Sequence, residues 1–134
     1  MSSTAAPAIH FRSAVPQFTV RDVVRTAEYY RDVLGFEIAG YWGTPPVFVI
    51  VRRGEVKFFF NLADHSEVRT GRARGAYDAY VHVSGVDALA AELRARGAEI
   101  LEEPEDREYG QRELVIRDCN GLILTFGEDT RQQG

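Results

Sequence analysis

The side chains of this chain that could bind a metal or act as nucleophiles are few and scattered. The histidines are His10, His65 and His82, and the one cysteine, Cys119, has no neighbouring base. A thiol in such surroundings is more often inert than nucleophilic. The sequence contains neither the spacing of a catalytic triad nor a phosphate-binding loop. We therefore expect each histidine to be a surface residue or a hydrogen-bonding residue of a pocket.

Asp78 and His82 are a carboxylate and an imidazole that share one face of a predicted strand. Residues 77–83 alternate in the way a strand does, which directs both side chains to the same side. Four residues at about 3.3 Å each separate them by ~13 Å, too far for both to bind one ion. This pair therefore predicts no metal site.

These side chains are positioned by a supersecondary unit that the sequence repeats. Residues 15–38, VPQFTVRDVVRTAEYYRDVLGFEI, predict a strand, a helix and the start of a further strand. Asp22 is placed to cap the helix, and Gly35 to end it in a left-handed conformation. Residues 81–100, VHVSGVDALAAELRARGAEI, repeat this pattern with a helix that ends at Gly97.

Both units continue with three strands, so the chain predicts one α+β domain made of two βαβββ modules. We expect module one over 12–63, a flexible linker over 64–75, and module two over 76–128, with an acidic loop at 102–110. Alternation in the closing strands directs six apolar residues toward the helices: Val56, Phe58, Phe60, Leu122, Leu124 and Phe126. The two curved sheets would be related by a pseudo-twofold axis and would form a concave ligand cleft.

Composition and charge exclude several classes of function. The chain has 134 residues and a net charge of −4, and its 15 arginines are scattered while Lys57 is its one lysine. Nucleic-acid binding needs a positive stripe, so we do not expect it. No apolar run approaches the ~20 residues that span a bilayer, and the first residues do not resemble a secretory signal. We expect a cytoplasmic protein without a membrane partner.

The layout resembles the vicinal oxygen chelate superfamily, which includes glyoxalase I, extradiol dioxygenases and the bleomycin resistance proteins. DVVRTAEYYRDVLGFEI in the first module and RELVIRDCNGLILTFGE near the end carry the resemblance over roughly residues 12–128. The AVPQFTV opening and the short VRRGEVKFFF hairpin are most similar to the bleomycin resistance proteins. The resemblance specifies the fold more strongly than the ligand, because the superfamily hosts many chemistries.

The resemblance also implies where a catalytic metal would bind. The family's enzymes take ligands from the first and last strand of each module, and these positions correspond here to Val15, Phe59, Asp78 and Thr125. A catalytic metal typically needs at least three protein ligands, and a lone Asp does not supply them. We therefore expect neither a metal nor another cofactor, and no catalytic residues.

The residues expected to line the cleft are aromatic and polar instead. Flat rings with a few hydrogen-bonding groups suit a planar or cationic antibiotic-like ligand. The alternative for the rings near Trp42 is that they fill the core or a subunit interface, and Arg112 and Glu113 could pair with each other rather than hold a ligand. The expected ligand-binding residues are Gln17, Trp42, Phe59, Asn61, Asp78, Tyr80, His82, Tyr109, Arg112, Glu113 and Thr125.

Two functions follow from this pattern. The first, which we favour, is a metal-independent protein of the bleomycin-resistance type that sequesters an antibiotic or a related metabolite. The resemblance implies that such a protein is a homodimer with its cleft at the subunit interface and an exchanged first strand. The second is a glyoxalase- or dioxygenase-like metalloenzyme, a lyase, isomerase or oxygenase acting on a small oxygenated substrate, or a metal-free variant that uses Asp78, His82 or Glu113 as acid or base.

Overall fold

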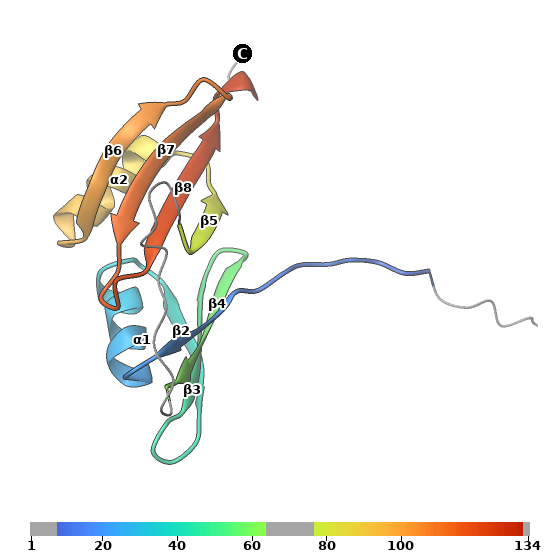
Figure 1. Cartoon of the computed structure of the whole chain (residues 1–134), viewed down its shortest axis with the longest axis vertical. Coiled ribbons are helices and arrows are strands. Elements are labelled where there is room, and N and C mark those ends of the chain that lie inside the picture. The colour runs from blue at the N-terminus through green and yellow to red at the C-terminus, as the bar shows by residue number, and fades with distance from the viewer. Residues whose placement is uncertain (1–7, 64–76, 133–134) are drawn as a thin grey trace, which may run out of the picture.

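The computed structural model describes residues 8–63 and 77–132, and within them the predicted repeat is present (Figure 1). The first module contains β1 (Gln17–Val20), α1 (Val23–Asp32), β2 (Glu37–Trp42), β3 (Phe48–Arg53) and β4 (Val56–Leu62). The second contains β5 (Ala79–His82), α2 (Val86–Ala95), β6 (Glu99–Asp106), β7 (Gln111–Arg117) and β8 (Ile123–Asp129), followed by the short 3₁₀ helix η1 (Thr130–Gln132). The predicted linker, together with His65, lies outside the described residues.

Both modules build a four-stranded sheet of the same topology. The strand orders are β1-β4-β3-β2 and β5-β8-β7-β6, and the first strand of each module pairs in parallel with the last. The remaining pairs are antiparallel. Figure 1 shows the modules end to end, each with its helix against one face of its sheet. The α+β fold of two βαβββ modules is therefore confirmed.

The core lies between each helix and its sheet. Phe58 and Phe60 of β4, with Leu124 and Phe126 of β8, are buried on this side, as their alternation predicts. Tyr30 of α1 is also fully buried, with its ring centroid 4.9 Å from that of Phe60. The opposite face of each sheet carries no helix, and we call these two surfaces the helix-free faces.

The helix ends show how local and distant residues share the capping. Asp22 accepts a hydrogen bond from the Arg25 amide at 2.9 Å, and Gly35 and Gly97 both have positive φ, as predicted. The residue before α2 is Gly85, which has no side chain to cap the helix. Glu128 of β8 accepts hydrogen bonds from the Gly85 and Val86 amides instead. Neither helix in the described ranges is long and apolar enough to cross a membrane.

The acidic stretch after Leu101 is a strand for most of its length, so the predicted loop is wrong there. Residues 99–106 form β6, which pairs with β7 through two irregularities of register, and the turn begins only at Arg107. Arginines from neighbouring elements offset the repulsion between the carboxylates, since Arg107 contacts Glu102 and Glu105 while Arg112 contacts Asp106. The density of acidic residues favoured a loop, because the sequence does not show that arginines outside the strand neutralise these carboxylates.

Each module contacts the other through the turn between its last two strands. Asp118, in the turn between β7 and β8, accepts a hydrogen bond from the buried Tyr30 hydroxyl of α1 at 2.7 Å. Arg53, at the turn between β3 and β4, forms two hydrogen bonds with Glu92 of α2, at 2.8 and 3.0 Å. One contact is buried and the other is partly exposed, so the pseudo-symmetric halves are linked by unequal bonds.

Candidate functional site

The helix-free face of the first sheet presents rings beside amide groups. Phe48 lies between Trp42 and Phe59, with ring centroids 5.5 Å apart in both edge-to-face pairs. Gln17 of β1 donates a hydrogen bond to Asn61 of β4 at 3.1 Å. Trp42 is 51% exposed although it is the largest apolar side chain of the sheet. This face therefore offers an aromatic surface with hydrogen-bonding groups at its edge.

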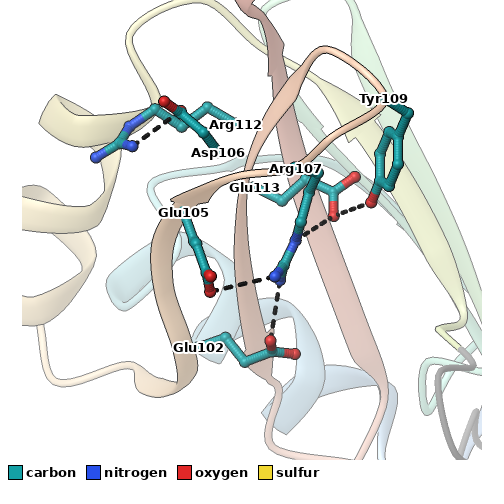
Figure 2. Close-up of polar contacts among 7 residues, drawn as sticks. All are labelled: Glu102, Glu105, Asp106, Arg107, Tyr109, Arg112 and Glu113. Atoms are coloured by element: carbon teal, nitrogen blue, oxygen red, sulfur yellow. Dashed lines mark hydrogen bonds and ion pairs between the residues drawn. The ribbon is translucent and has the colours of Figure 1, made fainter.

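The helix-free face of the second sheet is organised around Glu113 of β7, which is 5% exposed (Figure 2). Its carboxylate accepts hydrogen bonds from the hydroxyls of Tyr80 at 2.7 Å and Tyr109 at 2.6 Å, and from Arg107 Nε at 3.2 Å. These donors lie on β5 and on the turn between β6 and β7. A buried carboxylate needs such partners, because its desolvation is otherwise very costly.

The hydrogen bonds determine the charge states in this cluster. Burial alone would raise the pKa of Glu113, but the hydrogen bonds from Tyr109, Tyr80 and Arg107 together lower it below its usual value. The same contacts act in the opposite direction on the phenols. The bond to Glu113 raises the pKa of Tyr109 to about 12, and burial followed by that bond raises the pKa of Tyr80 further. At neutral pH the carboxylate is charged and both phenols are protonated.

The neighbourhood of this cluster carries more negative than positive charge. Arg107 contacts Glu102 at 2.9 Å and Glu105 at 3.2 Å in addition to Glu113 (Figure 2). Three carboxylates thus surround one guanidinium, and their hydrogen bonds raise the pKa of Arg107. The excess of negative charge favours a ligand with a positive group or with hydrogen-bond donors.

A pocket of about 450 Å³ lies where the two modules meet. Pro16 and the residues before it line one side, Lys57 and Phe59 of β4 line another, and Tyr80 and His82 of β5 complete it. Tyr80 and His82 have ring centroids 5.1 Å apart. We call this space the junction pocket, because it connects residues of both helix-free faces.

The donor set at the family's metal positions does not fit a metal. Val15 and Phe59 are hydrocarbon, and Thr125 is 2% exposed. The carboxylate of Asp78 accepts the Ile123 amide at 2.8 Å, which ties it to the neighbouring strand. Within residues 8–63 and 77–132, no three side chains of His, Cys, Asp or Glu come together as metal ligands would.

The structure brings most of the predicted site residues together in two groups. Trp42, Phe59, Gln17 and Asn61 share the first helix-free face, and Tyr80, His82, Tyr109 and Glu113 share the second. Asp78 and Thr125 also lie on the side of the second helix-free face. Asp78 accepts a hydrogen bond from the neighbouring strand, and Thr125 is buried. Whether these residues bind a ligand stays a prediction.

Arg112 lies on the other side of β7 from Glu113 (Figure 2), which excludes their pairing and places the Arg112 side chain away from the second helix-free face. Its guanidinium contacts Asp87 of α2 and Asp106 of β6, each at 3.0 Å. Arg112 and Glu113 therefore do not pair, since adjacent residues of a strand point to opposite faces.

The predicted site residues did not include Phe48, Arg107 and Gln111, which contact members of the two groups. Phe48 had a detectable signal, because it lies in an alternating strand on the face opposite to the core residues Val49 and Val51. Arg107 and Gln111 had none, since Arg107 lies in the predicted loop after β6 and Gln111 begins β7 ahead of the predicted strand. Gln111 comes within 3.3 Å of the Tyr80 hydroxyl through its side-chain oxygen.

The fold consists of two repeated βαβββ modules whose helix-free faces carry aromatic residues, and a comparison with known families identifies the same fold. The profile of the Glyoxalase/Bleomycin resistance protein/Dioxygenase superfamily matches residues 10–126. The chain therefore belongs to this superfamily. A search of curated proteins finds no match.

Solved structures agree on the fold at low sequence identity. TioX from Micromonospora sp. ML1 is 19% identical with a TM-score of 0.72, covering 89% of this chain and 99% of its own. A glyoxalase-related enzyme from Clostridium phytofermentans is 18% identical with a TM-score of 0.74, covering 92% and 99%. The bleomycin-binding protein from Streptomyces verticillus, complexed with copper(II)-bleomycin, is 26% identical with a TM-score of 0.68, covering 89% and 97%.

Proposed function

We propose that this protein binds a small molecule without a metal cofactor of its own and sequesters an antibiotic or related metabolite. The observation that carries the proposal is the replacement of metal-binding side chains by rings and hydrogen-bonding groups on the helix-free faces. A metal-dependent enzyme of this superfamily needs three or more ligands at those positions. A binding protein needs only shape, stacking and a few polar contacts.

The acid–base alternative has less support from the geometry. A general base is most effective with a pKa near the working pH, whereas the pKa of Glu113 is lowered by its three donors. Those donors also occupy the carboxylate oxygens that would accept a proton. This arrangement favours binding over proton transfer.

A second copy of the chain is the proposed partner. Residues 8–12 extend away from the body of the protein (Figure 1), and Ile9 and Phe11 of this arm are 88% and 100% exposed. Two largely exposed apolar side chains at alternate positions are costly in water and suit burial against another subunit. We propose a homodimer in which the arms are covered and the ligand binds near the subunit contact.

Trp42 provides a direct test, because it is the one tryptophan of the chain and lies on the first helix-free face. Copper(II)-bleomycin added to protein purified with a chelator is expected to quench Trp42 fluorescence saturably. Calorimetry should give the same affinity and one ligand per subunit, and light scattering should give the mass of a dimer.

Trp42→Phe is the matched control, since calorimetry should still detect binding after the fluorescence change is lost. Binding abolished by the chelator, together with a stoichiometric divalent ion in the untreated protein, would refute the metal-independent proposal. A monomeric mass at all concentrations would refute the proposed dimer alone.

A further inference from the structure

Tyr80 occupies the space that a side chain at position 127 would fill. A Cβ atom built on Gly127 would lie 2.5 Å from Tyr80 Cζ and 2.8 Å from Tyr80 Cε1, well inside van der Waals contact. Gly127 lies in β8 without a positive φ, so its backbone conformation does not require glycine. The absence of a side chain here serves the position of the Tyr80 ring.

The far end of the Tyr80 ring is held by the buried carboxylate of Glu113. The Tyr80 hydroxyl has one hydrogen to donate, and its 2.7 Å distance to Glu113 is shorter than its 3.3 Å distance to Gln111. The hydroxyl therefore donates to Glu113, and its oxygen can only accept a hydrogen bond from a ligand. A bond to an ionised acceptor is roughly twice as strong as a neutral one.

The first module lacks this arrangement, although it has the same fold. The registers place Asn61 where the second module has Gly127, and Phe48 where it has Glu113. Gln17 is the residue equivalent to Tyr80, and its side chain donates a hydrogen bond to Asn61. Because one module folds without the arrangement, a βαβββ module does not require it.

We propose that Gly127 and Glu113 are positioning residues that hold Tyr80 as a fixed wall of the junction pocket, and that this wall selects cationic or hydrogen-bond-donating ligands over anionic ones. Tyr80 lines the junction pocket, and its hydroxyl bond to a charged carboxylate makes the ring more electron-rich, which favours contact with a cation. An anionic group at this wall would meet an oxygen that has no hydrogen to give. The inference deepens the proposed function and rests on it.

The positioning role is tested without any ligand through the ionisation of Tyr80. Protein carrying ring-labelled tyrosine is titrated by ¹³C NMR, and Tyr80→Phe identifies the Tyr80 signal. Gly127→Ala and Glu113→Gln should each bring the pKa of Tyr80 down toward its ordinary value of 10. Asn61→Ala, at the equivalent position of module one, should leave it unchanged. An unchanged Tyr80 titration in both variants would overturn the positioning role, and Glu113→Gln remains informative if Gly127→Ala does not fold.

The selectivity is tested with two probes that share the naphthalene ring system and differ in charge, the cation 1-naphthylmethylamine and the anion 1-naphthoate. Calorimetry should show the amine binding at least about tenfold more tightly. Both Gly127→Ala and Glu113→Gln should reduce the ratio of the two affinities. In a protein that already carries Tyr80→Ala, adding Gly127→Ala should leave this ratio unchanged. Equal binding of the two probes, or binding of neither, would overturn the selectivity. Failure of copper(II)-bleomycin to bind, with the amine still preferred, would instead refute only the antibiotic assignment.

Discussion

At the scale of single residues, Glu113 shows how a buried charge is made tolerable. Its donors come from separate parts of the second module, so the carboxylate joins β5 to the turn between β6 and β7. Each hydrogen bond to a charged group contributes about 1.5–3 kcal/mol, which offsets the cost of removing the charge from water. The cluster therefore stabilises the same surface that is proposed to bind ligand.

Glu113 also predicts a pH dependence of stability. Its pKa is lowered from an ordinary value of 4.5, so its stabilising contribution is present above that value and is lost as pH falls through the folded pKa. Glu113→Gln is expected to reduce the free energy of unfolding by about 1–3 kcal/mol at neutral pH. Urea unfolding at several pH values should show the difference from the parent protein shrinking below pH 4.5. A constant difference down to acid pH would contradict this assignment.

At the scale of elements, the two helices begin in different ways although the modules repeat. Asp22 caps α1 from the adjacent residue, whereas α2 is capped by Glu128 from the last strand. A negative charge at a helix N-terminus also interacts favourably with the helix dipole. The link makes the start of α2 dependent on the correct placement of β8.

Removing this distant cap has a predictable cost. Glu128→Ala should lower the free energy of unfolding by about 0.5–2 kcal/mol, as should Asp22→Ala on α1. Glu108→Ala, an exposed carboxylate in the turn after β6, is the control and should have little effect. Thermal and urea unfolding measure all three. Equal stability of Glu128→Ala and the control would show that the amides of Gly85 and Val86 find water instead.

At the scale of the whole molecule, the modules are joined by contacts of unequal burial. Burial raises the pKa of Asp118 even though Tyr30 and the Leu122 and Asn120 amides donate to it. Arg53 and Glu92 meet at a partly exposed site, where an ion pair contributes at most about 1 kcal/mol. The Tyr30–Asp118 side is therefore expected to dominate the attachment.

This difference is open to measurement with two conservative variants. Tyr30→Phe removes a donor from a buried carboxylate and should cost about 1–3 kcal/mol, whereas Glu92→Gln should cost less than about 1 kcal/mol. The loss in Tyr30→Phe should grow as pH rises from acid to neutral, because Asp118 is then ionised with one donor fewer. A larger cost for Glu92→Gln would reverse the assigned roles of the two contacts.

The sequence alone determined the repeat and the faces of its strands. The predicted caps at Asp22 and Gly35 and the inward direction of Phe58 and Phe60 hold, because they depend on neighbours within one or two turns or on simple alternation. The same alternation placed Tyr80 and Asn61 on the surfaces without a helix.

Tertiary structure decided what those surfaces contain. Three features depend on segments more than 30 residues apart in sequence that lie side by side: the bond from Tyr80 to Glu113, the space that Gly127 leaves for the Tyr80 ring, and the cap that Glu128 provides for α2. The carboxylates of β6 are offset by Arg107 and Arg112, which approach them in the folded β6–β7 hairpin. The local pattern indicates which face of a segment is buried, whereas charge compensation and steric space depend on side chains that only folding brings into contact.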